Sequence, residues 1–190
     1  MEDDAVAGRP LLLALDPGTR WLGWAFADLA DGAPVECGRA DISEKAAPSL
    51  TYEDRLTGAL NALRWRGVGH GRVLVIYVEG AGGGPNPKNT LMIAECAGAT
   101  IQECARVWPR CPVERLAPAE WKKIAGIKGN ADKAAVAERA AALGWRFDHK
   151  ADDASDAALI ATAGVIRNHE ILARAEAAEA DREATDGNME

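Results

Sequence analysis

The feature that most constrains this chain is a short apolar run that ends in a carboxylate. Leu11 to Leu15 contain no polar residue, which predicts a central strand buried on both faces. Asp16 ends this run, Pro17-Gly18 predicts a tight turn, and Trp21 to Phe26 resumes strand character, so we predict a β-hairpin over residues 10–28. A carboxylate at a buried strand end is costly unless a positive partner, such as a metal ion, lies against it. Alternatively, Asp16 only braces the turn through its own backbone.

The rest of the chain predicts one α/β domain. Its 190 residues, 48% of them hydrophobic, suit a single core. From the apolar periodicity we predict further strands at 35–42, 73–78 and 112–116, and helices at 51–66, 89–106, 118–125, 131–143 and 153–174. The Gly- and Pro-rich residues 80–87 predict a loop.

The charge distribution leaves a nucleic-acid partner possible. We expect a flexible arm at 1–9, a folded domain at 10–175 and an acidic disordered tail at 176–190. The net charge is −7, but residues 2–4 carry three acids and the tail carries −5, so the folded part is almost neutral. It lacks the strongly basic character of many DNA-binding domains.

Carboxylates recur at positions where elements end or begin. Glu79 follows the apolar strand at 73–78, and Asp153 and Asp156 are three residues apart at the start of a helix, so they face the same side. Acids in a first helical turn also act as caps, which is the ordinary explanation of such a pair. If Asp16 and these three acids converge, their mutual repulsion requires a divalent cation, and hard oxygen ligands favour Mg²⁺ or Mn²⁺.

At these positions the sequence resembles the RuvC family of Holliday-junction resolvases, within the ribonuclease H-like superfamily. The matching residues are Asp16-Pro17-Gly18-Thr19-Arg20 followed by Gly23, then Val78-Glu79, Gly129 to Lys133, and Asp153-Ala154-Ser155-Asp156. The resemblance extends from residue 11 to about residue 170. It implies a ribonuclease H-like fold, with a mixed five-stranded sheet of three antiparallel and then two parallel strands, flanked by helices.

The resemblance also implies an activity. Asp16, Glu79, Asp153 and Asp156 would hold two Mg²⁺ ions, with Mn²⁺ able to substitute, for hydrolysis of four-way or other branched DNA. Lys133 matches the family lysine that contacts a phosphate, although without the match it reads as a solvated lysine at a helix start. The helix at 89–106 matches the one through which RuvC-like proteins form a two-fold dimer, which suits two symmetric cuts.

One departure concerns the loop after Glu79. RuvC proteins carry an aromatic residue there that is thought to wedge into the junction, whereas this chain has Gly82 and no aromatic between residues 80 and 87. Divergence of this kind is common among phage and prophage members, so the resemblance extends to a divergent member of that type. As phosphate-contacting candidates we name Lys88, Asn89, Lys122, Lys123 and Lys128. Trp121 beside Lys122 and Lys123 suits DNA contact, but we favour core packing with the lysines reaching solvent.

Three other classes of function share parts of this pattern. A RuvC-related nuclease that processes structured RNA shares the Asp16-to-Gly23 pattern, and a non-catalytic DNA-binding module is a further alternative. Sugar-kinase or actin-like ATPases need a second domain, for which 190 residues leave no room. The acidic N-terminus, the absence of a membrane-length apolar run and four cysteines without C-x-x-C spacing predict a cytoplasmic protein of a bacterial cell or phage-infected host.

Overall fold

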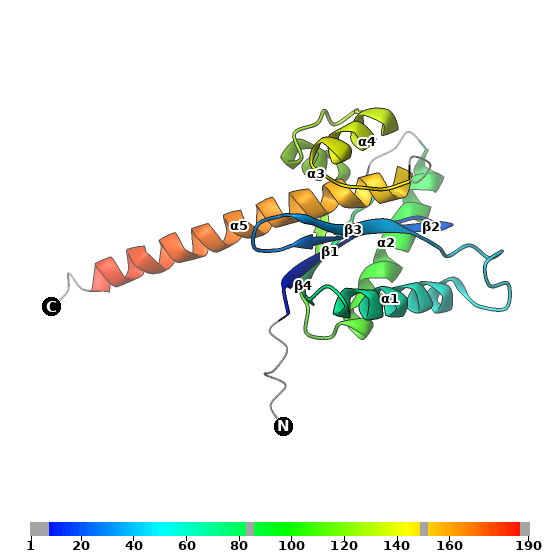
Figure 1. Cartoon of the computed structure of the whole chain (residues 1–190), viewed down its shortest axis with the longest axis horizontal. Helices are drawn as coiled ribbons and strands as arrows, with labels where there is room; N and C mark the ends of the chain where they lie inside the picture. Colours follow the sequence, from blue (N-terminus) through cyan, green and yellow to red (C-terminus); the bar gives the residue numbers. More distant parts are fainter. Residues whose placement is uncertain (1–7, 83–85, 149–151, 187–190) are drawn as a thin grey trace, which may run out of the picture.

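The computed structural model describes residues 8–82, 86–148 and 152–186, and these form an α/β domain (Figure 1). The strands are β1 (Pro10–Pro17), β2 (Trp21–Asp28), β3 (Pro34–Asp41), β4 (Arg72–Glu79) and β5 (Val113–Leu116). The helices are α1 (Tyr52–Val68), α2 (Pro87–Val107), α3 (Pro118–Ile124), α4 (Lys133–Ala142) and α5 (Asp152–Asp186). The predicted element order is confirmed.

The five strands form one mixed sheet in the order β3-β2-β1-β4-β5. β1 pairs antiparallel with β2, which pairs antiparallel with β3, whereas β1–β4 and β4–β5 are parallel pairs. The predicted sheet of three antiparallel and then two parallel strands is therefore confirmed. β1 lies at its centre, as a strand without polar residues requires.

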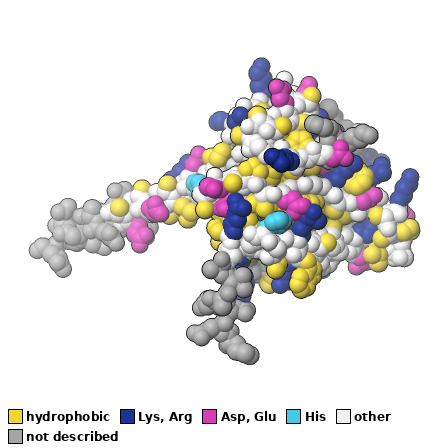
Figure 2. Space-filling view, in the orientation of Figure 1, with side chains coloured by type: hydrophobic (Ala, Val, Ile, Leu, Met, Phe, Trp, Pro, Cys, Tyr) yellow, Lys and Arg dark blue, Asp and Glu magenta, His cyan; other side chains and the backbone are white. Residues whose placement is uncertain are grey.

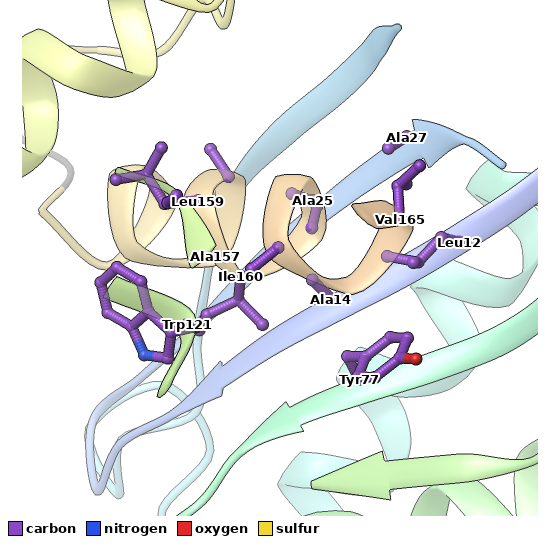
Figure 3. Packing of buried hydrophobic residues seen from close by; sticks show 14 of the residues in the cluster. Leu12, Ala14, Ala25, Ala27, Tyr77, Trp121, Ala157, Leu159, Ile160 and Val165 are labelled. Atoms are coloured by element: carbon purple, nitrogen blue, oxygen red, sulfur yellow. The ribbon is translucent and has the colours of Figure 1, made fainter. Parts of the chain in front are cut away.

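The apolar side chains of β1 divide between the two faces of the sheet. Leu12 and Ala14 pack in one cluster with α3, α4 and α5, while Leu11, Leu13 and Leu15 pack in a second cluster with α1 and α2. Figure 3 shows Leu12 and Ala14 against residues of α5. All five side chains are fully buried, so β1 is the shared centre of a three-layer structure.

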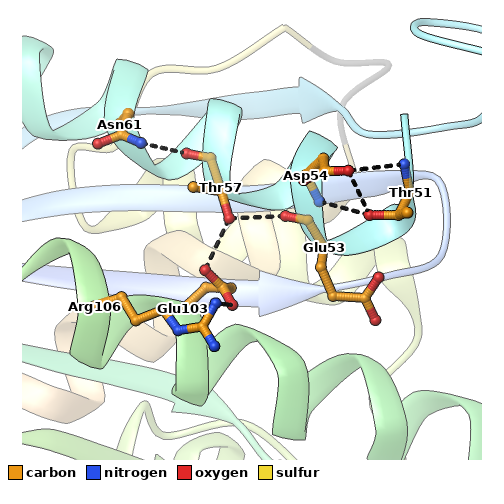
Figure 4. A network of polar contacts seen from close by, with 7 residues as sticks. All are labelled: Thr51, Glu53, Asp54, Thr57, Asn61, Glu103 and Arg106. Atoms are coloured by element: carbon orange, nitrogen blue, oxygen red, sulfur yellow. Dashed lines mark hydrogen bonds and ion pairs between the residues drawn. The ribbon is translucent and has the colours of Figure 1, made fainter. Parts of the chain in front are cut away.

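Polar contacts join α1 to α2 on the second face (Figure 4). The Thr57 hydroxyl of α1 donates to Oε2 of Glu103 at 2.8 Å, and Nη1 of Arg106 donates to Oε1 of the same carboxylate at 3.0 Å. Glu103 is buried, so these two donors offset the loss of its hydration. At the start of α1, Thr51 and Asp54 form a capping box.

The helix boundaries lie within two residues of our prediction, except at the C-terminal end of α5. α2 begins at Pro87 rather than residue 89, because Asn86 caps it and proline is favourable in a first turn. α5 continues to Asp186, so residues 176–186 of the expected disordered tail are helical, in keeping with their high Ala and Glu content. This end of α5 projects beyond the sheet (Figure 1). The remaining tail residues 187–190 and residues 1–7 of the expected arm lie outside the described part.

None of the helices in the described ranges combines the length and apolar content needed to cross a membrane. On the face shown in Figure 2, described Lys and Arg side chains alternate with Asp and Glu and form no continuous basic stripe. This matches the nearly neutral charge of the folded part of the sequence.

Candidate active site

The site is built at the carboxyl ends of the two central parallel strands. Leu15 of β1 pairs with Val78 of β4, so Asp16 and Glu79, each the next residue, emerge side by side at the same edge. Asp16 is only 9% exposed and Glu79 is partly buried. The two carboxyl groups lie close enough for a hydrogen bond between them when one is protonated. The register of β1 and β4 thus places these two strand-end acids next to each other.

α5 brings a third carboxylate to this edge. Asp156 is 7% exposed, and Lys133, the first residue of α4, donates from Nζ to its Oδ2. The Asp156 carboxylate also raises the pKa of both Asp16 and Glu79, so the three acids lie within electrostatic reach of one another. Lys133, which the family resemblance singled out, therefore lies in the same cluster as the three acids.

Asp153 lies at the margin of this cluster. Its charge raises the pKa of Asp156 and of Lys133, and its side chain is half-exposed. Its backbone is held against β2, where a Cβ on Gly23 would lie 2.2 Å from the Asp153 carbonyl oxygen. Glycine is required there because the start of α5 approaches the sheet too closely for any side chain.

Burial and like charges raise the pKa values of the central acids. Burial raises the pKa of Asp16 well above its usual range, and Glu79 and Asp156 raise it further. Burial also raises the pKa of Glu79 and of Asp156, partly offset by a hydrogen bond from Asp16 at Glu79 and by Lys133 at Asp156. For Lys133, burial lowers the pKa, but Asp156 outweighs it and the net direction is upward. The cluster thus carries more carboxylates than its one lysine neutralises.

Two residues that the sequence did not identify as site residues support the acids. The indole Nε1 of Trp121, in α3, donates to Oε1 of Glu79 at 2.7 Å, and the ring is buried in the α5 cluster. The core packing that we favoured for Trp121 is confirmed, but its polar partner was missed. Tyr52 donates from its hydroxyl to the Gly18 carbonyl at 3.1 Å and so ties the turn after Asp16 to α1. No sequence pattern signals either contact.

The donor chemistry of the cluster fits a divalent cation. Hard carboxylate oxygens in excess of positive charge, at a partly open strand end, are the ligands that Mg²⁺ and Mn²⁺ prefer. In the described ranges, however, no three His, Cys, Asp or Glu side chains are arranged to hold a metal ion as they stand. Lys133 is bonded to Asp156, so cation binding by Asp156 requires this contact to rearrange.

Of the five predicted phosphate-contacting residues, one lies beside the acids of the site. Lys122 lowers the pKa of Asp156 and donates to the carbonyl of Ala131 at 3.3 Å, so it belongs beside the site. The other four side chains are exposed, and no contact joins them to the acids: they are Lys88 and Asn89 in the first turn of α2, Lys123 in α3, and Lys128 after it. Gly82, the position of the missing aromatic residue, lies against Pro118.

Comparisons with known proteins identify the fold. No family model matches the chain, and no curated protein matches it. Among solved structures, Thermus thermophilus RuvC aligns with a TM-score of 0.62 and 16% identity, covering 84% of this chain and 96% of that one. A Thermus thermophilus RuvC in complex with a Holliday junction substrate gives 0.58 and 18%, covering 80% and 90%. The yeast mitochondrial Holliday junction resolvase Ydc2 gives 0.53 and 16%, covering 86% and 80%.

These alignments extend over most of each chain. The identities are low, so the likeness establishes the architecture rather than the chemistry. The chain has a RuvC-like, ribonuclease H-like fold.

Proposed function

We propose that this chain is a divalent-metal-dependent endonuclease that cuts four-way or other branched DNA. The observation that carries the proposal is the cluster of Asp16, Glu79 and Asp156 at the central strand ends of a RuvC-like sheet. Such a cluster is electrostatically unfavourable without a cation, which is typical of a functional site rather than of a structural one. The likeness to RuvC and Ydc2 favours a junction-resolving nuclease.

Each residue has a role in this proposal. Asp16, Glu79 and Asp156 would hold two Mg²⁺ ions, or Mn²⁺ in their place, with Asp153 completing the set from the margin. The bound ions would lower the pKa of an attacking water and stabilise the leaving oxygen of the phosphodiester. The pKa of Asp16 is raised and a ligating carboxylate must be ionised, so cation binding strengthens as the pH rises.

Lys133 would exchange its partner when substrate arrives. The raised pKa of Lys133 keeps its ammonium group charged, and its side chain is more than half-exposed. A DNA phosphate beside the site can therefore replace Asp156 as the partner of the ammonium group, which leaves the Asp156 carboxylate free to bind a cation. Lys122 would assist at the same side, with Lys88, Asn89, Lys123 and Lys128 contacting more distant phosphates.

We also propose that α2 forms a homodimer, so that two sites cut opposite strands of one junction. Leu91, Met92 and Ile93 of α2 are exposed large hydrophobic side chains, which supports an interface at this helix. Sedimentation of wild type and Leu91→Glu tests it, with Trp65→Glu on α1 as a control exposed apolar residue. A dimer that survives Leu91→Glu, or a monomeric wild type, would contradict this interface.

Cleavage of a panel of labelled nucleic acids tests the substrate class. A four-way junction, a 5′ flap, a linear duplex and a structured RNA of equal length are incubated with Mg²⁺ or with EDTA. We expect Mg²⁺-dependent products from the branched DNAs, at least ~10-fold faster than from the duplex, which corresponds to about 1.4 kcal/mol of transition-state discrimination. Preferential cleavage of RNA would assign the RNA-processing alternative, and binding without any cleavage would assign the non-catalytic one. The proposed membership of a phage-type subgroup stays a prediction.

A further inference from the structure

A buried tryptophan donates its indole N–H to one of the acids of the proposed site. Trp121 is 1% exposed, and its Nε1 lies 2.7 Å from Oε1 of Glu79. Figure 3 shows its ring at one end of the apolar cluster beneath α5, with Ile160 beside it. The ring is fixed by packing, so the direction of its N–H group is fixed as well.

This contact restrains Glu79 from the side of α3. Glu79 is the last residue of β4 and pairs with Leu116 of β5, so the sheet fixes its backbone but not the direction of its carboxylate. The hydrogen bond from Trp121 fixes one carboxylate oxygen and favours the ionised form, because an N–H group donates more strongly to a carboxylate than to a neutral acid. Asp16 lies beside the same carboxyl group, so Glu79 has Trp121 on one side and a second acid on the other.

We infer that Trp121 is a positioning residue, whose indole N–H orients Glu79 for binding a divalent cation. This inference rests on the proposed function and assigns to that site a supporting residue in α3. Groups that hydrogen-bond a metal-ligating carboxylate set its direction, and their removal weakens metal binding by roughly 10-fold to 100-fold. A tryptophan whose only role is packing would leave cation affinity unchanged when its N–H group is removed.

The chain contains a matched control for this inference. Trp145 is 4% exposed, belongs to the same apolar cluster, and donates from Nε1 to Oγ1 of Thr162 at 3.1 Å. Trp121→Phe and Trp145→Phe therefore remove the same atoms from the same core. They differ in the acceptor that is left without a donor: a carboxylate of the site in one case and a hydroxyl in the other.

The test is Mn²⁺ binding in the absence of DNA, measured by calorimetry on wild type and both variants, with thermal unfolding to confirm that each is folded. We expect Trp121→Phe to weaken Mn²⁺ binding about 10-fold and Trp145→Phe to change it less than about twofold. Equal binding by Trp121→Phe and wild type would overturn the inference, as would equal weakening in the two variants. Failure of the wild type to bind Mn²⁺ would also overturn it, because Glu79 would then have no cation to be oriented for.

A second readout needs neither metal nor activity. In a ¹⁵N-labelled sample, the indole resonances missing from each Phe variant identify Trp121 and Trp145. We expect Glu79→Gln to shift the Trp121 indole resonance and to leave that of Trp145 in place, and an unmoved Trp121 resonance would overturn the inference. If Mn²⁺ binding depends on Trp121 but no nucleic acid is cut, the positioning role stands and the proposed function fails.

Discussion

Gly23→Ala should displace the proposed site without replacing any of its acids. Gly23 lies in β2 opposite Asp16, and an added Cβ would lie 2.2 Å from the carbonyl oxygen and 2.7 Å from the carbonyl carbon of Asp153. Real Cβ atoms essentially never approach closer than 3.0 Å, so the start of α5 must move by at least about 0.8 Å. Both contacts are with backbone, which cannot turn away as a flexible side chain could.

The expected magnitude follows from that displacement. Asp153 and Asp156 move with the first turn of α5, and a misplacement of about 1 Å in a catalytic group costs roughly 100-fold in rate. Forcing an extra carbon into a tightly packed contact costs about 1–3 kcal/mol of stability. We therefore expect a folded but less stable protein that cleaves branched DNA about 100-fold more slowly.

The assay compares single-turnover cleavage of a four-way junction with thermal unfolding of the same samples. Gly58→Ala in α1 is the control, since its Cβ would meet no neighbouring atom within 4 Å and alanine is favoured over glycine inside a helix by about 0.5–1 kcal/mol. This control should be more stable and fully active. If Gly23→Ala cleaves at the wild-type rate, the close packing of α5 on β2 does not position the acids, and the reasoning fails.

Three further predictions concern charge and burial. Asp16→Asn should raise the free energy of unfolding by about 1–2 kcal/mol near pH 8 and by much less near pH 4. Folding raises the pKa of Asp16, so its ionised carboxylate destabilises the folded state, and this destabilisation is absent at a pH where Asp16 is protonated. Equal differences in urea unfolding at both pH values would contradict this. Lys133→Met should slow cleavage about 100-fold. Because Lys133 lowers the pKa of Asp156, the substitution should also move the acidic side of the pH–rate profile to higher pH. An unmoved pH–rate profile would argue against the ion pair of Lys133 and Asp156. Thr57→Val should cost about 1–3 kcal/mol by leaving the buried Glu103 with one donor fewer, without changing cleavage, and an unaltered unfolding midpoint would count against the network.

The local part of the structure was predictable from the sequence. Leu11 to Leu15 indicated the central strand because a strand between two helical layers needs apolar side chains on both faces. Asp16 and Glu79 were predictable as neighbours because parallel strands end at the same edge of a sheet. The extent of α5 was not, since an acidic Ala-rich segment can be either helical or disordered.

The contacts that complete the site depend on tertiary packing and were not predictable. Trp121 and Glu79 are 42 residues apart, and their hydrogen bond exists because α3 packs under α5 at the end of β4. Likewise, the sequence showed Gly23 only as part of a motif, whereas the structure shows that glycine is needed there because the Asp153 backbone packs against it. A single sequence records residue types but not which side chains lie close enough to bond.

The most direct test of the central claim is single-turnover cleavage of a four-way junction by wild type, Asp16→Asn and Asp28→Asn, with Mg²⁺ or EDTA. Asp28 is 8% exposed, about as buried as Asp16. It is the last residue of β2, at the opposite edge of the sheet from Asp16, and it forms an ion pair with Arg9. We predict Mg²⁺-dependent cleavage by wild type and folded Asp28→Asn, and a rate at least about 1,000-fold lower for Asp16→Asn. No Mg²⁺-dependent product from wild type, or undiminished cleavage by Asp16→Asn, would contradict a catalytic role for the acid cluster.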